Sequence, residues 1–131
     1  ASPDLFFAGW YYGMKPGGDV TPDILAQRGI NTLVLSESCI HLNKDRPEAS
    51  MDLLFDDMIR LGQVFDKQAE ADALVDGWKA KLAEIRSGVP AGAQKRVFLF
   101  DSGEDKPFTA GKYAIANAMI RLTPKRDFQK D

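Results

Sequence analysis

The sequence predicts an α/β protein with a parallel sheet, because short apolar segments alternate with helical patterns along the chain. Three observations support this prediction: an apolar run over residues 4–9, a helix that starts at Thr21 and has clear start and stop signals, and a β-branched apolar run over residues 32–36. A strand, a helix and a second strand in this order imply a right-handed parallel unit. The complete predicted order is strand, helix, strand, two helices, strand and helix.

Residues with clear conformational preferences bound the first elements. The segment over residues 4–9 (DLFFAG) is followed by a glycine-rich stretch, so we interpret it as a buried strand that leads into a loop. Thr21 is a favourable N-cap residue, and Pro22 suits the first helical position. Gly29 stands where a helix that ends in left-handed backbone needs glycine.

Two longer helices are predicted in the middle of the chain. Ser50 can cap the first, Gly62 weakens its end, and its apolar face consists of Leu54, Met58, Leu61 and Phe65. Asp66 can cap the second, which runs to Arg86 and spans roughly 30 Å. Its charged residues, Arg86 among them, are expected to face water, and its apolar stripe consists of Ala71, Leu74, Val75, Trp78, Leu82 and Ile85.

A third strand is predicted over residues 96–100 (RVFLF). A turn-rich segment follows it, and Thr109 is expected to cap a helix over about residues 110–121. Residues 123–131 are charged, contain a proline and are expected to form a tail. Because three strands make a small sheet and parallel sheets are covered by helices on both faces, the pattern indicates part of a larger protein.

The composition excludes several classes of protein. The chain has 131 residues, of which 44% are hydrophobic and 27% charged, as in folded globular proteins. A net charge of -2 leaves no broad basic surface for nucleic acid. No apolar run reaches the roughly 18 residues of a membrane span, so no membrane insertion is expected. The first residues lack the pattern of a signal peptide, and an exported protein would carry that signal outside this sequence.

Ligands of open α/β sheets gather beyond the carboxyl ends of the strands. Three predicted loops occupy such places, over residues 9–14, 36–42 and 101–109. The first carries three consecutive aromatic residues that suit a bulky ligand or simply cover the strand ends. The third has carboxylates at Asp101, Glu104 and Asp105, which either cap turns or receive a hard cation or cationic ligand groups.

Cys39 and His41 lie two residues apart in the second loop. A catalytic pair needs a third orienting group and an oxyanion hole, and the sequence indicates neither. We therefore interpret them as a buried structural cysteine and a surface histidine. With one cysteine and one histidine, the chain has neither an internal disulfide nor a structural zinc site, and no cofactor is expected. The common nucleotide and hydrolase motifs are also absent.

Four segments in order resemble the iron-complex family of periplasmic binding proteins: PDLFFAGWYYGM, TPDILAQRGINTLVLSESC, LGQVFDKQAEADALVDGWKAKLAEI and VFLFDSGEDKPFTAG. The resemblance covers about residues 3–120. It implies two α/β lobes joined by one long helix, with the ligand in a cleft between them. Residues 1–65 would then be the later part of the first lobe, residues 66–87 the connecting helix, and residues 88–131 the beginning of the second lobe.

The resemblance also implies a function and a set of site residues. The protein would be the substrate-binding component of an ABC importer, and it would be periplasmic or an extracellular lipoprotein. Its partners would be the transporter permease and a ferric siderophore or a related metal chelate such as haem or cobalamin. The ligand would be held by stacking, hydrogen bonds and shape, without catalysis, through Trp10, Tyr11, Tyr12, Glu37, Ser38, Asp101, Ser102, Gly103, Glu104, Phe108 and Thr109.

Two other functions remain open at this stage. One is a small α/β metal-dependent hydrolase that uses the carboxylates between Asp101 and Asp105, and the other is a noncatalytic interaction domain. The long helix favours the receptor, because a compact enzyme has no need of such a connector. The family also presents an acidic residue to the permease near the end of the helix after the third loop. This chain has Ile120 and Arg121 there, so a docking residue cannot be transferred.

Overall fold

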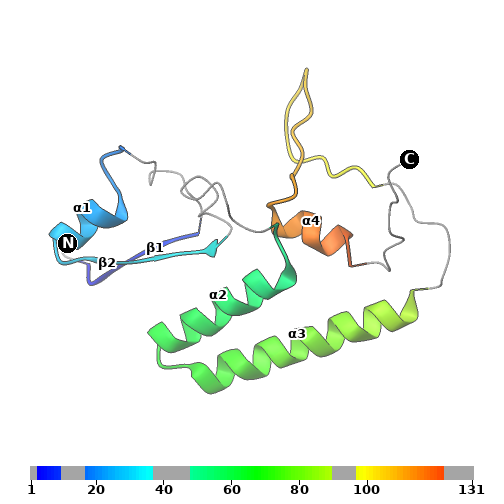
Figure 1. Ribbon diagram of the computed structural model, residues 1–131, viewed down its shortest axis with the longest axis horizontal. Coiled ribbons are helices and arrows are strands. Elements are labelled where there is room, and N and C mark those ends of the chain that lie inside the picture. The colour runs from blue at the N-terminus through cyan, green and yellow to red at the C-terminus, as the bar shows by residue number, and fades with distance from the viewer. Residues whose placement is uncertain (1–2, 10–16, 37–47, 90–96, 123–131) are drawn as a thin grey trace. The chain divides into compact units, whose positions relative to one another are not determined.

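The computed structural model describes residues 3–9, 17–36, 48–89 and 97–122, which fall into two compact units (Figure 1). The first unit spans residues 1–47 and the second spans residues 48–131. Helices and a parallel pair of strands are both present, so the predicted α/β class is confirmed.

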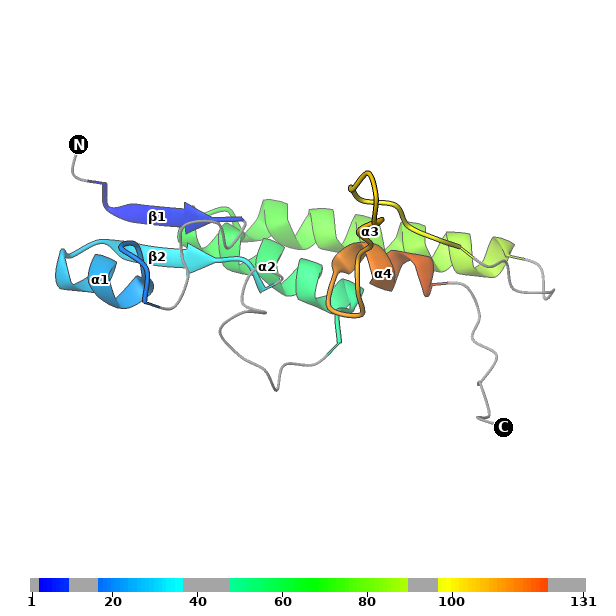
Figure 2. The same cartoon turned by 90° about the horizontal axis from the view of Figure 1, so that it is seen from above.

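The first unit is a strand, a helix and a strand, as predicted. Strand β1 (Leu5–Ala8) pairs in parallel with β2 (Asn31–Val34), and helix α1 (Pro22–Gln27) lies between them in sequence. The register runs from Leu5 opposite Asn31 to Ala8 opposite Val34, and the two strands lie side by side in Figure 2. Their carboxyl ends therefore meet at one edge of the sheet.

The predicted ends of α1 are confirmed in detail. The Thr21 hydroxyl accepts a hydrogen bond from the backbone N–H of Ile24 at 3.2 Å, so it caps the helix as expected. Gly29 adopts φ 72°, and its N–H donates to the carbonyl of Ala26 at 2.9 Å. The turn directs the chain back towards the sheet, where a small core forms around Ala8 and Leu25.

Helices dominate the second unit. Helix α2 (Met51–Val64) and helix α3 (Gln68–Gly88) form a helical hairpin, and the shorter α4 (Ile115–Ile120) contacts α2. Ser50 is the N-cap residue of α2, as predicted, although its side chain makes no capping hydrogen bond. None of the helices in the described parts of the chain is long and apolar enough to cross a membrane.

The prediction that Asp66 caps α3 is wrong. Asp66 lies in the turn between α2 and α3 with φ 55°, and Lys67 occupies the N-cap position. The N–H of Lys67 donates to the carbonyl of Gly62 at 2.7 Å, which closes the turn. Aspartate is one of the few residues besides glycine and asparagine that enter left-handed backbone readily, so the same side chain that suits a cap also suits this turn.

Gly62 brings α2 and α3 into close contact. A Cβ atom at Gly62 would lie 2.5 Å from the Cβ of Ala71, and both residues are buried. Phe55 and Val75 are also buried within this hairpin. The sequence indicated that Gly62 weakens the end of α2, and the structure shows in addition that the missing side chain permits a close contact with α3.

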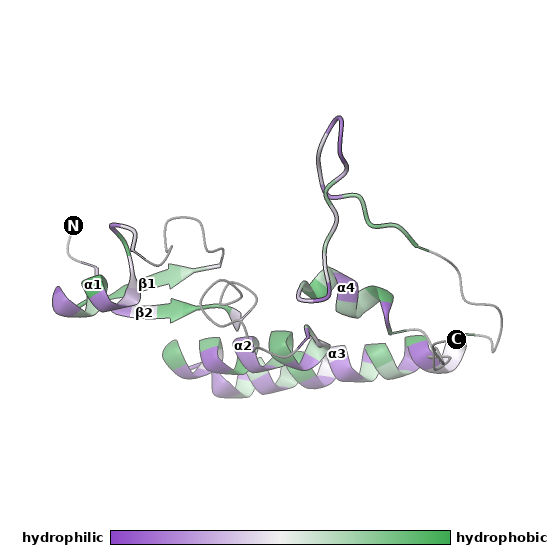
Figure 3. Ribbon diagram, turned by 45° about the horizontal axis from the view of Figure 1, so that its top comes forward, coloured by the Kyte–Doolittle hydropathy of each residue, from purple (hydrophilic) through white to green (hydrophobic). Residues whose placement is uncertain are grey.

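The apolar stripes of the two helices are only partly covered in the second unit. On α3, Ala71 and Val75 are buried, but Leu74 and Ile85 are 42% and 48% exposed. Phe65, predicted on the covered face of α2, follows the helix and is exposed. Figure 3 shows apolar and polar residues alternating along both helices.

The predicted third strand is not formed in the described part of the segment, residues 97–100. A strand needs hydrogen bonds from a neighbour, and here Val97, Phe98 and Phe100 are exposed. The predicted helix over residues 110–121 is shorter and begins at Ile115, with Ala114 and not Thr109 at the N-cap. A turn closed by the Ala114 N–H on the carbonyl of Gly111 precedes it.

Asp57 is a buried acidic residue on α2, and its carboxylate pairs with the guanidinium of Arg60 one turn further along. The Asp57 side chain is 9% exposed, and that of Arg60 is 43% exposed. Burial of a carboxylate is unfavourable unless charged or polar partners compensate it, so the pair contributes to the stability of the helical hairpin.

We expect Gly62→Ala to destabilise the protein by about 1–2 kcal/mol, because the clash with Ala71 exceeds the gain in helix propensity. The matched control is Gly77→Ala in α3, where an added Cβ meets nothing within 4 Å and should stabilise by about 0.5–1 kcal/mol. Urea denaturation measures both changes. Equal effects of the two substitutions would contradict the close contact.

We expect Arg60→Met to lower the free energy of unfolding by about 1–3 kcal/mol, since it removes a charged partner from the buried Asp57 carboxylate. The control is Lys81→Met, which removes the exposed pair with Glu84 and should cost at most about 1 kcal/mol. Denaturation at neutral pH compares the two variants. If Lys81→Met lowers the free energy of unfolding more than Arg60→Met does, the pair between Arg60 and the buried Asp57 does not stabilise the fold as expected.

Candidate ligand-binding site

Two of the three predicted ligand loops leave the sheet of the first unit at the same edge. Gly9 directly follows β1, and Ser36 follows β2 by two residues. The N–H of Leu35 donates to the carbonyl of Ala8 at 3.1 Å, which extends the parallel pairing to the ends of both strands. The predicted site residues of these loops lie outside the described residues: Trp10, Tyr11, Tyr12, Glu37 and Ser38.

The third loop, in the second unit, is a narrow hairpin. The N–H of Asp101 donates to the carbonyl of Phe108 at 3.0 Å, and the N–H of Phe108 donates to the carbonyl of Ser102 at 2.7 Å. Gly103 adopts φ 102°, and a Cβ atom there would clash with the carbonyl oxygen of Lys106. Glycine is thus required at this turn, and Figure 1 shows the hairpin in yellow.

The hairpin presents its predicted site residues to solvent: Asp101, Ser102, Gly103, Glu104, Phe108 and Thr109 are all exposed. Phe108 is 67% exposed, which makes it an accessible apolar surface for a ligand. Asp101, Glu104 and Asp105 do not gather into a metal site, since no group of three such ligands occurs within the described residues. The cation-binding interpretation of this loop therefore finds no support there.

Glu48 ties the start of α2 to the chain before and after α4. Its carboxylate lies 2.7 Å from the Arg121 guanidinium and 3.5 Å from the Lys112 ammonium. The hydrogen bond from Arg121 lowers the pKa of Glu48, and Lys112 lowers it further. The N–H of Ala49 also donates to the carbonyl of Lys112 at 2.9 Å. The segment that follows the hairpin is thus fixed to α2.

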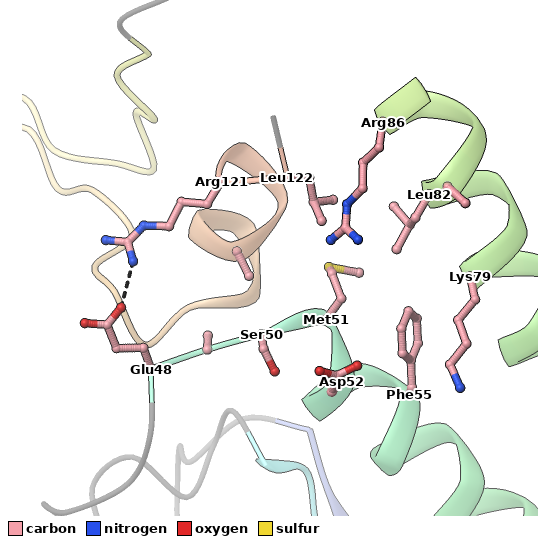
Figure 4. Close-up of a pocket in the computed structure, with 13 residues that line it drawn as sticks. Glu48, Ser50, Met51, Asp52, Phe55, Lys79, Leu82, Arg86, Arg121 and Leu122 are labelled. Atoms are coloured by element: carbon pink, nitrogen blue, oxygen red, sulfur yellow. Dashed lines mark hydrogen bonds and ion pairs between the residues drawn. The ribbon is translucent and has the colours of Figure 1, made fainter. Parts of the chain in front are cut away.

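A pocket that the sequence did not indicate lies among α2, α3 and the end of α4 (Figure 4). Its volume is about 590 Å³. Met51, Phe55 and Leu82 supply apolar walls, and the guanidinium of Arg86 points into the space above Met51. Arg86 was expected to face water, and it is exposed as expected. What the sequence did not indicate is that residues at the end of α4 line the same pocket as this exposed guanidinium.

The sequence profile of the periplasmic binding protein family matches residues 2–128. The chain belongs to the periplasmic binding protein family. Members of this family are solute-binding proteins without catalytic activity. A comparison with curated protein sequences finds no match.

Solved periplasmic binding proteins share the fold. A periplasmic binding protein from Veillonella parvula DSM 2008 aligns with a TM-score of 0.71 at 18% identity, covering 98% of this chain and 40% of that one. A possible iron-binding (periplasmic solute-binding) protein from Staphylococcus epidermidis ATCC 12228 aligns with a TM-score of 0.59 at 26% identity, covering 92% and 42%. The chain thus spans about two fifths of the length of these relatives.

Protonation of Glu48 should break its ion pairs with Arg121 and Lys112. Because the folded protein lowers the pKa of Glu48, the stabilisation is present above the ordinary value of 4.5 and is lost as the pH falls through the lowered value. We expect Arg121→Gln to move the pKa of Glu48 upward, as measured by an NMR titration of its side-chain carboxyl. Arg28→Gln, at the C-cap of α1, is the control and should leave that titration unchanged. An unchanged titration in Arg121→Gln would disprove the tie.

Proposed function

We propose that this periplasmic binding protein is the substrate-binding component of an ABC importer and that it carries a ferric siderophore or a similar bulky metal complex. The family match over residues 2–128 carries the receptor part of the proposal. The likeness to a possible iron-binding protein, at 26% identity over 92% of this chain, supports a metal complex as cargo. The protein would act in the periplasm, or as a lipoprotein on the cell surface.

The chemistry of the third loop supports a binding role. Phe108 offers a flat apolar surface, while Ser102 and the exposed backbone of the hairpin offer hydrogen-bond donors and acceptors. In the proposed site these groups act together with Trp10, Tyr11, Tyr12, Glu37 and Ser38 from the loops that follow β1 and β2. Stacking and hydrogen bonding hold the ligand, and no bond is broken.

The long helix supports a two-lobe arrangement. Helix α3 has 21 residues and is therefore about 30 Å long, which is enough to connect two lobes. In the proposal, residues 1–65 are the later part of the first lobe, residues 66–87 are the connector, and residues 88–131 begin the second lobe. A rigid connector of this kind limits hinge closure, so modest opening and closing are expected.

A thermal-shift screen against ferric hydroxamate and catecholate siderophores, haem and cobalamin tests the proposal. A cognate complex at about 100 times its dissociation constant should stabilise the folded protein by roughly 2.7 kcal/mol, which is visible as a rise in Tm. The same siderophores without iron are the matched control for the metal complex. Absence of a shift with every metal complex in the full-length protein would overturn the proposed cargo.

The role of the hairpin has its own test. We expect Phe108→Ala to weaken binding of the complex found in the screen by about five- to tenfold, because one stacking surface is lost. Phe65→Ala removes another exposed phenylalanine, at the α2–α3 turn, and should leave the affinity unchanged. Tryptophan fluorescence titration measures both. Equal affinities of the two variants would show that Phe108 does not contact the bound complex.

A further inference from the structure

The pocket among α2, α3 and α4 has a net positive lining. Lys79, Arg86 and Arg121 are its cations, and Glu48 and Asp52 are its carboxylates, which leaves one positive charge in excess. Glu48 is already compensated, since Arg121 lies 2.7 Å from it and Lys112 outside the lining lies 3.5 Å from it. The charge of Glu48 therefore repels an incoming anion only weakly.

Arg86 is the cation that remains available. Within the described residues, no hydrogen bond or ion pair engages its guanidinium, which points into the pocket in Figure 4. Lys79 lies 5.5 Å above the ring of Phe55, and Arg121 pairs with Glu48. The first turn of α2 also borders the pocket, and the Ser50 side chain makes no capping hydrogen bond to its N–H groups. Both features favour negative charge.

Apart from Ser50, the uncharged residues of the lining are apolar. Met51, Phe55 and Leu82 form walls beside Arg86, and the small residues Ala83 and Ala118 leave room between them. A volume of about 590 Å³ lies in the range that small organic ligands occupy. An aliphatic chain or an aromatic ring would cover the apolar walls, while its charged end would lie at Arg86.

We propose that this pocket binds an amphipathic monoanion, a carboxylate or sulfonate with an aliphatic or aromatic tail. The site is separate from the proposed metal-complex site, because it shares no residue with the hairpin over residues 101–109. The carboxylate accepts hydrogen bonds from the Arg86 guanidinium, and the tail lies against Met51, Phe55 and Leu82.

Octanoate is the probe, and octylammonium, with the same number of carbon atoms and the opposite charge, is its matched control. NMR titration of the protein should show that octanoate shifts the amide signals of Met51, Leu82 and Ala118, whereas octylammonium leaves them in place. Arg86→Gln should weaken octanoate binding by about tenfold, since one charge-assisted interaction is lost. Arg28→Gln, at the C-cap of α1 and outside the pocket, should have no effect.

Filling the pocket gives a second, independent test. Ala83→Phe places a ring in the lining and should abolish octanoate binding, whereas Ala80→Phe adds the same ring to an exposed position of α3 outside the lining. Three results would overturn the proposal: equal binding of octanoate and octylammonium, equal effects of the two phenylalanine variants, or a full-length protein in which further polypeptide fills the pocket and octanoate shifts no signal. A protein that binds octanoate but no siderophore complex would show that the pocket binds its ligand independently of the proposed function.

Discussion

The close contact between Gly62 and Ala71 is the constraint on which the second unit depends. It sets the distance between α2 and α3 at the turn, where Lys67 closes the backbone onto Gly62. From that fixed end, α2 extends back to Met51 and α3 extends forward to Gly88. The pocket and the contacts of Glu48 with Lys112 and Arg121 both lie at the opposite end of the α2–α3 pair. Their geometry therefore depends on the angle at which the two helices leave the turn.

The hairpin over residues 101–109 is connected to the α2–α3 pair through a few hydrogen bonds and ion pairs. Glu48 and Ala49 at the start of α2 bind Lys112 and Arg121 on either side of α4. The hairpin itself is closed by two backbone hydrogen bonds between its arms. Its base is therefore anchored to the helices, while its tip is shaped mainly by Gly103. Phe108 belongs to the pair that closes the hairpin, so a ligand that contacts it would bind close to this anchored base.

Sequence patterns predicted the elements whose determinants are local. Thr21, Pro22 and Gly29 set the ends of α1 within one turn of themselves, so their chemistry was sufficient. The segment at Val97–Phe100 needed a neighbouring strand that apolar character alone cannot supply. The function of Asp66 was misjudged because a cap and a left-handed turn favour the same residue. Arg86 is exposed as the helical pattern predicted, but the pocket beside it also involves α4, which lies about thirty residues further along the chain, so the sequence could not indicate it.

The pocket and the hairpin over residues 101–109 differ in how much side-chain conformational entropy a bound ligand would cost. The apolar walls of the pocket, Met51, Phe55 and Leu82, are buried or half-buried, so little conformational entropy is lost in ordering them. The hairpin has only exposed side chains, and a ligand that immobilises Phe108 and its neighbours must offset the cost of ordering them. A bulky complex that contacts several loops at once divides that cost among many contacts. A small ligand held by the hairpin alone cannot do so, and this difference favours large cargo at the loops and small molecules in the pocket.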